Sequence, residues 1–228
     1  MSQRVVCLHT VLSAAAQFGT LTQELLPASV QVWHTTDEIL AKVAVAQGGL
    51  SPFIYRRVAE HVRAAEEAGA DVVQLTCSSI SPCAEVVQAL VKIPVLKVDD
   101  PMVDRALGMG RRIGVAATAA TALAAVSALV RDRARASGQS VTVDDVLCEG
   151  AYADMVSGNL TAHDKIVAAV LAEMSGRNDV IILAQASMAR VAEGIRPAPA
   201  VPILTSPRLA VERLRQVLHI STNTASQA

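Results

Sequence analysis

The sequence predicts an α/β fold with two pseudo-symmetric halves, each a parallel sheet covered by helices, and a site between them. Hydrophobic residues make up 52% of the 228 residues but aromatic residues only 2%, which favours helices packed on buried parallel strands. The sequence also aligns with itself at an offset of 108 residues: Arg4–Thr10 matches Arg112–Thr118, and Asp71–Ser79 matches Asp179–Ser187. The matches include Arg, Asp and Thr as well as aliphatic residues, so they indicate an internal duplication.

Short, continuous aliphatic runs predict four strands in each half, because strands covered on both faces are apolar throughout. In the first half these runs are Arg4–Leu8, Val30–His34, Asp71–Thr76 and Val95–Val98. In the second half they are Arg112–Ala117, Val141–Leu147, Asp179–Ala184 and Pro202–Leu204. Since strands alternate with helical segments, both sheets should be parallel.

The segments between the strands predict the helices. They are Ser13–Leu26, Pro52–Ala68, Pro82–Val91, Ala119–Ser137, Thr161–Ser175 and Pro207–Leu218. Ser51-Pro52 and Ser81-Pro82 are typical helix starts, because the serine caps free N–H groups and proline fits the first turn. We expect residues 1–98 with 207–220 to form the first half, 99–206 the second, and 221–228 a flexible tail.

Composition excludes several classes of function. Twenty basic residues against 21 acidic ones give a net charge of −1, so a nucleic-acid surface is not expected. The apolar run at the N-terminus ends after four residues and predicts a strand, not a signal or membrane segment. The four cysteines lack CxxC spacing, which favours reduced thiols and a cytoplasmic protein. His34, His61, His163 and His219 show no metal-ligand spacing with one another or with the cysteines, so no metal is expected.

Candidate chemistry follows the predicted strands. In open parallel sheets, ligands bind at the carboxyl ends of the strands, so the loops after the first and third strand of each half should meet. Cys77 ends the third strand within Thr76-Cys77-Ser78-Ser79 and precedes a predicted helix. A helix N-terminus lowers the pKa of a thiol, and this position therefore predicts a reactive thiolate flanked by hydroxyl groups.

Three segments, Leu75–Ser79, Arg112–Thr121 and Asp179–Ala184, resemble the aspartate/glutamate racemase superfamily, and the resemblance extends from Arg4 to about Leu218. This superfamily includes amino-acid and hydantoin racemases, maleate cis-trans isomerases and arylmalonate decarboxylases. Its members act without a cofactor on small carboxylates between two pseudo-symmetric domains. The resemblance implies that Cys77 is the first catalytic cysteine. It also implies that Ser78, Ser79, Thr118 and Thr121 bind the carboxylate. Thr10, Thr76 and Ser187 lie in the same strand-end loops and are further candidates for substrate binding.

The sequence departs from the racemase pattern at Gln185, which occupies the position of the second cysteine. A carboxamide does not titrate near neutral pH, so racemisation by two thiols is not expected. Gln185 could instead donate a hydrogen bond to a substrate oxygen or a developing enolate. His9, at the end of the first strand, is a candidate auxiliary acid or base.

Several reactions of a small carboxylate or amino-acid-like substrate therefore stay open. Cys77 could serve a cofactor-independent isomerase, by racemase-like proton transfer, tautomerisation or cis-trans isomerisation. It could instead be the proton-donating cysteine of a decarboxylase. The third alternative is a non-catalytic carboxylate-binding protein on a degenerate racemase scaffold. The helices that flank each half could also form a homodimer interface.

Overall fold

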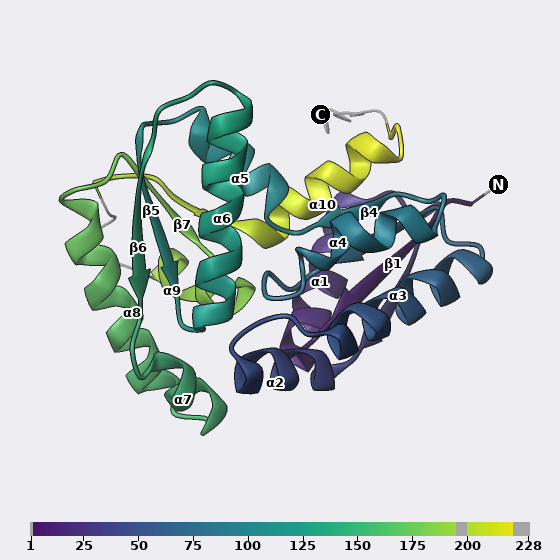
Figure 1. The fold of residues 1–228 in the computed structure, drawn as a ribbon, viewed down its shortest axis with the longest axis horizontal. Helices are drawn as coiled ribbons and strands as arrows, with labels where there is room; N and C mark the ends of the chain where they lie inside the picture. Colours follow the sequence, from purple (N-terminus) through teal and green to yellow (C-terminus); the bar gives the residue numbers. More distant parts are fainter. Residues whose placement is uncertain (1, 195–199, 221–228) are drawn as a thin grey trace, which may run out of the picture.

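The computed structural model, which describes residues 2–194 and 200–220, contains two four-stranded parallel sheets. Their strand orders are β2-β1-β3-β4 and β6-β5-β7-β8. Figure 1 shows them in separate halves, which confirms the predicted α/β fold. The first sheet contains β1 (Arg4–His9), β2 (Gln31–Thr36), β3 (Val72–Leu75) and β4 (Val95–Lys97), and the second β5 (Arg112–Ala117), β6 (Thr142–Leu147), β7 (Val180–Leu183) and β8 (Ile203–Thr205).

Helices connect the strands of each sheet. In the first half they are α1 (Leu12–Leu25), α2 (Glu38–Gln47), α3 (Pro52–Glu67), α4 (Cys83–Val87) and the 3₁₀ turn η1 (Gln88–Leu90). The helices that follow β4 along the chain are α5 (Asp100–Leu107), α6 (Ala120–Ala136), α7 (Ala151–Val156), α8 (Leu160–Ser175), η2 (Ala186–Met188), α9 (Ala189–Gly194) and α10 (Ser206–Val217). The sequence did not predict α2, α5, α7 or α9. No helix in these described ranges is long and apolar enough to cross a membrane.

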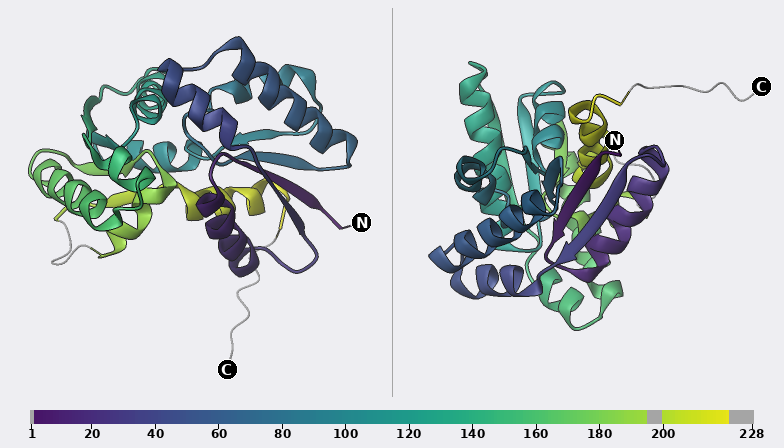
Figure 2. Two further views of the ribbon diagram at one scale, coloured as in Figure 1. Left: turned by 90° about the horizontal axis from the view of Figure 1, so that it is seen from below. Right: turned by 90° about the vertical axis from the view of Figure 1, so that its right-hand side faces the viewer.

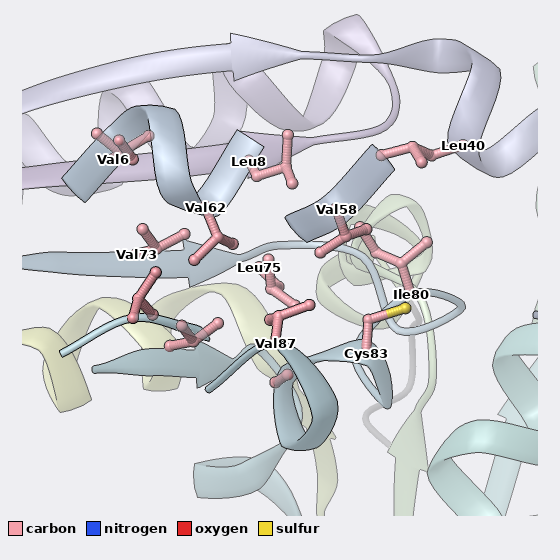
Figure 3. Packing of buried hydrophobic residues seen from close by; sticks show 14 of the residues in the cluster. Val6, Leu8, Leu40, Val58, Val62, Val73, Leu75, Ile80, Cys83 and Val87 are labelled. Carbon is pink, nitrogen blue, oxygen red and sulfur yellow. The ribbon is translucent and has the colours of Figure 1, made fainter. Parts of the chain in front are cut away.

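The central strand β1 is buried on both faces, as its continuous apolar sequence predicted. Figure 3 shows Val6 and Leu8 on one face, packed in a cluster that includes Val58 and Val62 of α3. Residues of the opposite face, such as Val5, pack in a second cluster that includes Phe18 of α1. Alternate residues of one strand therefore serve two separate cores.

The C-terminal helix α10 packs beside α1, in the first half (Figure 2). Its residues Val211 and Leu214 are buried in the same cluster as Val5, and Arg208 forms an ion pair of 2.6 Å with Glu24 of α1. By contrast, α5 packs in the cluster that contains β5. Because α10 also contacts α5, the division into residues 1–98 with 207–220 and residues 99–206 stays a prediction. The predicted tail, 221–228, lies outside the described residues.

The same backbone-to-aspartate hydrogen bond occurs at equivalent positions in each half. The backbone N–H of Arg4 donates to the Asp71 carboxylate at 2.7 Å, and that of Arg112 donates to the Asp179 carboxylate at 2.9 Å. Each aspartate lies directly before the third strand of its sheet and binds the start of the first strand. The matching contacts support the duplication that the sequence alignment predicted.

Candidate functional site

Cys77 lies in the loop after β3, as predicted, but the loop differs from the expected one. Helix α4 begins only at Cys83 and has five residues, so the intervening turn separates Cys77 from the helix N-terminus. Cys77 is partly buried, and burial is the largest influence on its thiol, whose pKa is raised. Hydrogen bonds from the Thr10 side chain and from the backbone of Ser79 and Ile80 act in the opposite direction. The prediction of a lowered pKa was therefore wrong, because the cost of removing a thiolate from water exceeds these hydrogen bonds.

Asp99 is a buried carboxyl group near Cys77 that the sequence interpretation missed. It follows β4 and is only 1% exposed, and its Oδ1 accepts a hydrogen bond of 2.8 Å from the Ser78 hydroxyl. Burial raises the pKa of Asp99 to about 7. A pKa near neutrality suits a group that transfers protons. The signal was available, because Asp99 directly follows a predicted strand, as Cys77 does.

Gln185 is held by three hydrogen bonds to its carboxamide oxygen. Oε1 accepts from Thr118 N at 2.6 Å, from Thr118 Oγ1 at 2.9 Å and from Ala119 N at 2.9 Å. An amide nitrogen could not accept these bonds, so they fix which side of the carboxamide is oxygen. Toward the described residues the amide nitrogen makes no hydrogen bond, and its two N–H groups are available as donors.

The surroundings of Cys77 and Gln185 match in the two halves. Thr10 and Thr118 are equivalent positions of the duplication, each following the first strand of its sheet. The Thr10 side chain hydrogen-bonds the Cys77 sulfur, and the Thr118 hydroxyl hydrogen-bonds the Gln185 oxygen. The duplicated fold therefore presents a thiol in one half and a carboxamide in the other from equivalent positions.

Two of the predicted substrate-binding residues join the halves directly. The hydroxyl groups of Ser79, beside Cys77, and Thr121, in the first turn of α6, are 2.9 Å apart. This contact brings the Cys77 loop to the segment that holds Gln185. Of the other predicted residues, Ser187 is half-buried in η2. The Thr76 hydroxyl is turned into the first half, where it donates to the Leu8 carbonyl at 3.0 Å.

His9, the candidate auxiliary acid or base, is fully buried, and both of its ring nitrogens lie within hydrogen-bond distance of another side chain. Its Nδ1 lies 2.8 Å from Thr76 Oγ1, and its Nε2 lies 2.9 Å from His34 Nδ1. Burial, and secondarily the neighbouring His34, lowers the pKa of His9 to about 4. The ring is therefore neutral near pH 7.

A cavity of about 310 Å³ adjoins the Cys77 loop between the halves. Ser81 and Asp99 line it beside the Cys77 loop, and Asp132 and Arg133 of α6 also line it. Lys97 is also in its wall. A second cavity, of about 530 Å³, runs along α6 and includes Ser127 and Asp145, away from the Cys77 loop. Of these two cavities, the 310 Å³ one reaches the Cys77 loop through Ser81 and Asp99, but neither is lined by Cys77 or Gln185.

Comparison with known structures places this fold among racemases. An allantoin racemase from Klebsiella pneumoniae is 17% identical with a TM-score of 0.66, over 96% of this chain and 88% of that chain. A glutamate racemase from Bacillus anthracis is 13% identical with a TM-score of 0.73, over 95% and 82%. A glutamate racemase from Francisella tularensis, solved with D-glutamate, is 18% identical with a TM-score of 0.72, over 96% and 81%.

A comparison with curated protein sequences gave no significant match. The family model described as Asp/Glu/Hydantoin racemase matches residues 15–214, which is most of the chain. It covers β2 to β4 of the first sheet, the whole second sheet, the Cys77 loop and Gln185, and it begins after β1. The chain therefore belongs to the Asp/Glu/hydantoin racemase family and is an isomerase of this superfamily.

Proposed function

We propose that the protein is a cofactor-independent isomerase of a small carboxylate or amino-acid-like substrate, with Cys77 as the acid/base group and Gln185 as a hydrogen-bond donor. The observation that carries this proposal is the anchored Gln185 carboxamide. Its oxygen accepts three hydrogen bonds, so the side chain can meet the substrate only as a donor. Chemistry that needs a base on each face of a carbon is therefore not supported.

The Gln185 amide would act on negative charge that develops on a substrate oxygen. Removing a proton beside a carboxylate or carbonyl group produces an enolate, whose oxygen gains charge as the C–H bond breaks. A preorganised donor aimed at such an oxygen contributes about 3 kcal/mol of transition-state stabilisation in a water-excluded site. Thr118 and Ala119 provide the preorganisation, because they fix the carboxamide from its other end.

Cys77 would carry the proton. The thiolate form of Cys77, which receives hydrogen bonds from Thr10 and from the backbone of Ser79 and Ile80, takes a proton from the substrate and leaves an enolate and a neutral thiol. The raised pKa of the thiol favours this protonated form, which then returns the proton to a neighbouring position of the substrate. A single group of this kind supports tautomerisation or another isomerisation on one face.

Hydrogen exchange in D₂O tests the proposal. The protein is incubated with racemisable amino acids, hydantoins and unsaturated dicarboxylates, and substrate deuteration, configuration and double-bond geometry are followed by NMR and chiral chromatography. We expect isomerisation or deuterium incorporation that Cys77→Ser abolishes. Cys148→Ala is the matched control, because Cys148 is a buried core thiol of the second half.

The Gln185→Cys variant tests the position opposite Cys77. We expect it to convert exchange without inversion into exchange with inversion, because it restores a thiol in each half. Release of CO₂ by the wild type would identify a lyase instead. Saturable binding without any exchange or conversion would identify a carboxylate-binding protein and contradict the proposed activity.

A further inference from the structure

Cys7, His9 and His34 lie together on one face of the first sheet. Cys7 and His9 are two positions apart in β1 and project to the same side, opposite Val6 and Leu8. In the parallel register of β1 and β2, His34 is the partner of Cys7. The Cys7 sulfur and one ring nitrogen of each histidine all lie within 4.8 Å of one another.

We propose that these three side chains form a binding site for Zn²⁺ or a similar borderline-soft divalent cation, with water as the fourth ligand. One thiolate and two imidazoles are donors that such ions prefer. Ligand atoms around a tetrahedral zinc ion are ~3–4 Å apart, given bond lengths of about 2.0–2.3 Å. His9 Nε2 and His34 Nδ1, which are 2.9 Å apart, need to separate only slightly. His34 is exposed on β2, an edge strand, and can adjust.

A hydrogen bond with Thr76 fixes the His9 ring in the tautomer that a metal ligand requires. The Thr76 hydroxyl has one hydrogen, which it donates to the Leu8 carbonyl at 3.0 Å. Its contact of 2.8 Å with His9 Nδ1 is then a bond in which Nδ1–H donates to the Thr76 oxygen. This leaves the lone pair of Nε2 directed toward His34 and the cluster. A ring fixed by a hydrogen bond on its second nitrogen is typical of metal-ligating histidines.

Metal binding at this cluster requires a defined change in protonation. In the metal-free form, His34 Nδ1–H donates to His9 Nε2. On binding, Nδ1 of His34 becomes a ligand and its proton moves to Nε2, while the Cys7 thiol loses its proton to solvent as the S–metal bond forms. One proton is therefore released per ion. The site would cross-link β1 and β2, and it does not depend on the proposed isomerase chemistry.

Titration of the EDTA-treated protein with Co²⁺, followed by Zn²⁺ competition, tests the site. We expect one ion per chain and a thiolate-to-cobalt charge-transfer absorption that Zn²⁺ removes. His34→Gln should weaken binding at least tenfold, and Cys7→Ser should abolish the absorption band. Two controls should leave both unchanged: Cys77→Ser, and His219→Asn, which replaces an exposed histidine with positive φ by a residue that tolerates this conformation.

A thermal-unfolding measurement keeps the test decisive if Cys7→Ser does not fold. Zn²⁺ should raise the Tm of the wild type and of His219→Asn, but not of His34→Gln, because only a folded site that holds the ion links binding to stability. The proposal is overturned if His34→Gln binds Co²⁺ as tightly as the wild type, if the absorption band persists in Cys7→Ser, or if no ion binds at millimolar Co²⁺.

Discussion

The Gln185 carboxamide oxygen lies 2.6 Å from the backbone nitrogen of Thr118 and 2.9 Å from its hydroxyl oxygen. Thr118→Val removes the hydroxyl but keeps the shape and the backbone donors. We expect a loss of about 1 kcal/mol in the free energy of unfolding, because one partly buried hydrogen bond is lost. We also expect a lower kcat, since the amide donors become less well oriented.

Urea unfolding and steady-state kinetics check this prediction. Thr142→Val is the control, because Thr142 is an exposed residue of the edge strand β6. Equal kcat values for wild type and Thr118→Val would show that the anchored carboxamide does not assist turnover.

The Cys77 thiol should react slowly with iodoacetamide at pH 7 and increasingly fast as pH rises above neutrality. Burial raises the pKa of this thiol, so the thiolate fraction grows about tenfold per pH unit below that pKa. Asp99→Asn should speed alkylation at a given pH, since the charge of Asp99 also raises the pKa. Peptide mass spectrometry gives the rates, with the fully buried Cys7 and Cys83 as internal references. A rate that levels off below pH 7 would contradict the raised pKa.

Asp99→Asn should also change the pH dependence of stability. The pKa of Asp99 is raised from 3.8 to about 7 in the folded protein. Below pH 3.8 both states are protonated and there is no penalty. Between pH 3.8 and about 7 the unfolded state ionises first, so the wild type loses stability as pH rises, by an amount on the order of a few kcal/mol.

The asparagine variant cannot ionise and should lack this loss, so its stability relative to the wild type should increase from pH 4 to pH 7. Urea unfolding at several pH values measures the difference. Asp132→Asn serves as the control because the Asp132 side chain is 66% exposed. Parallel stability curves for wild type and Asp99→Asn would exclude the shift.

The hydrogen bond between Ser79 and Thr121 should couple the two halves. We expect Ser79→Ala and Thr121→Val to show an interaction energy of about 0.5–1 kcal/mol in a double-mutant cycle, because the hydroxyl groups are 2.9 Å apart and partly buried. The free energy of unfolding of the four proteins provides the value. Strict additivity of the two single changes would mean that the bond contributes nothing in solution.

The sequence predicted the sheets well because two independent signals agreed. Continuous apolar runs located the strands, and the offset between Arg4 and Arg112 related the halves. The short helices α2 and α7 were missed, although α2 has a visible start and end: the Asp37 side chain accepts from Ile39 N, and Gly48 ends the helix with φ of 67°. The sequence therefore contains capping residues at both ends of α2, although the helix was not predicted.

The candidate site was predicted less completely. Position after a strand was enough to select Cys77, and the duplication was enough to select Gln185. The ionisation of Cys77 was mispredicted because burial and the exact helix start depend on tertiary packing. The cluster of Cys7, His9 and His34 could not be seen from spacing along the chain, because His34 joins it through the pairing of β1 with β2.

Helix α10 gives the chain a distinctive order of assembly. Its residues Val211 and Leu214 complete a core whose other members include Val5, near the opposite terminus. During translation, β1 is synthesised long before α10 and lacks this cover until α10 follows, whereas the strands β5 to β8 of the second sheet all precede α10. The second sheet should therefore mature before the first, and a nascent chain stalled before α10 would expose an unsealed apolar surface to chaperones.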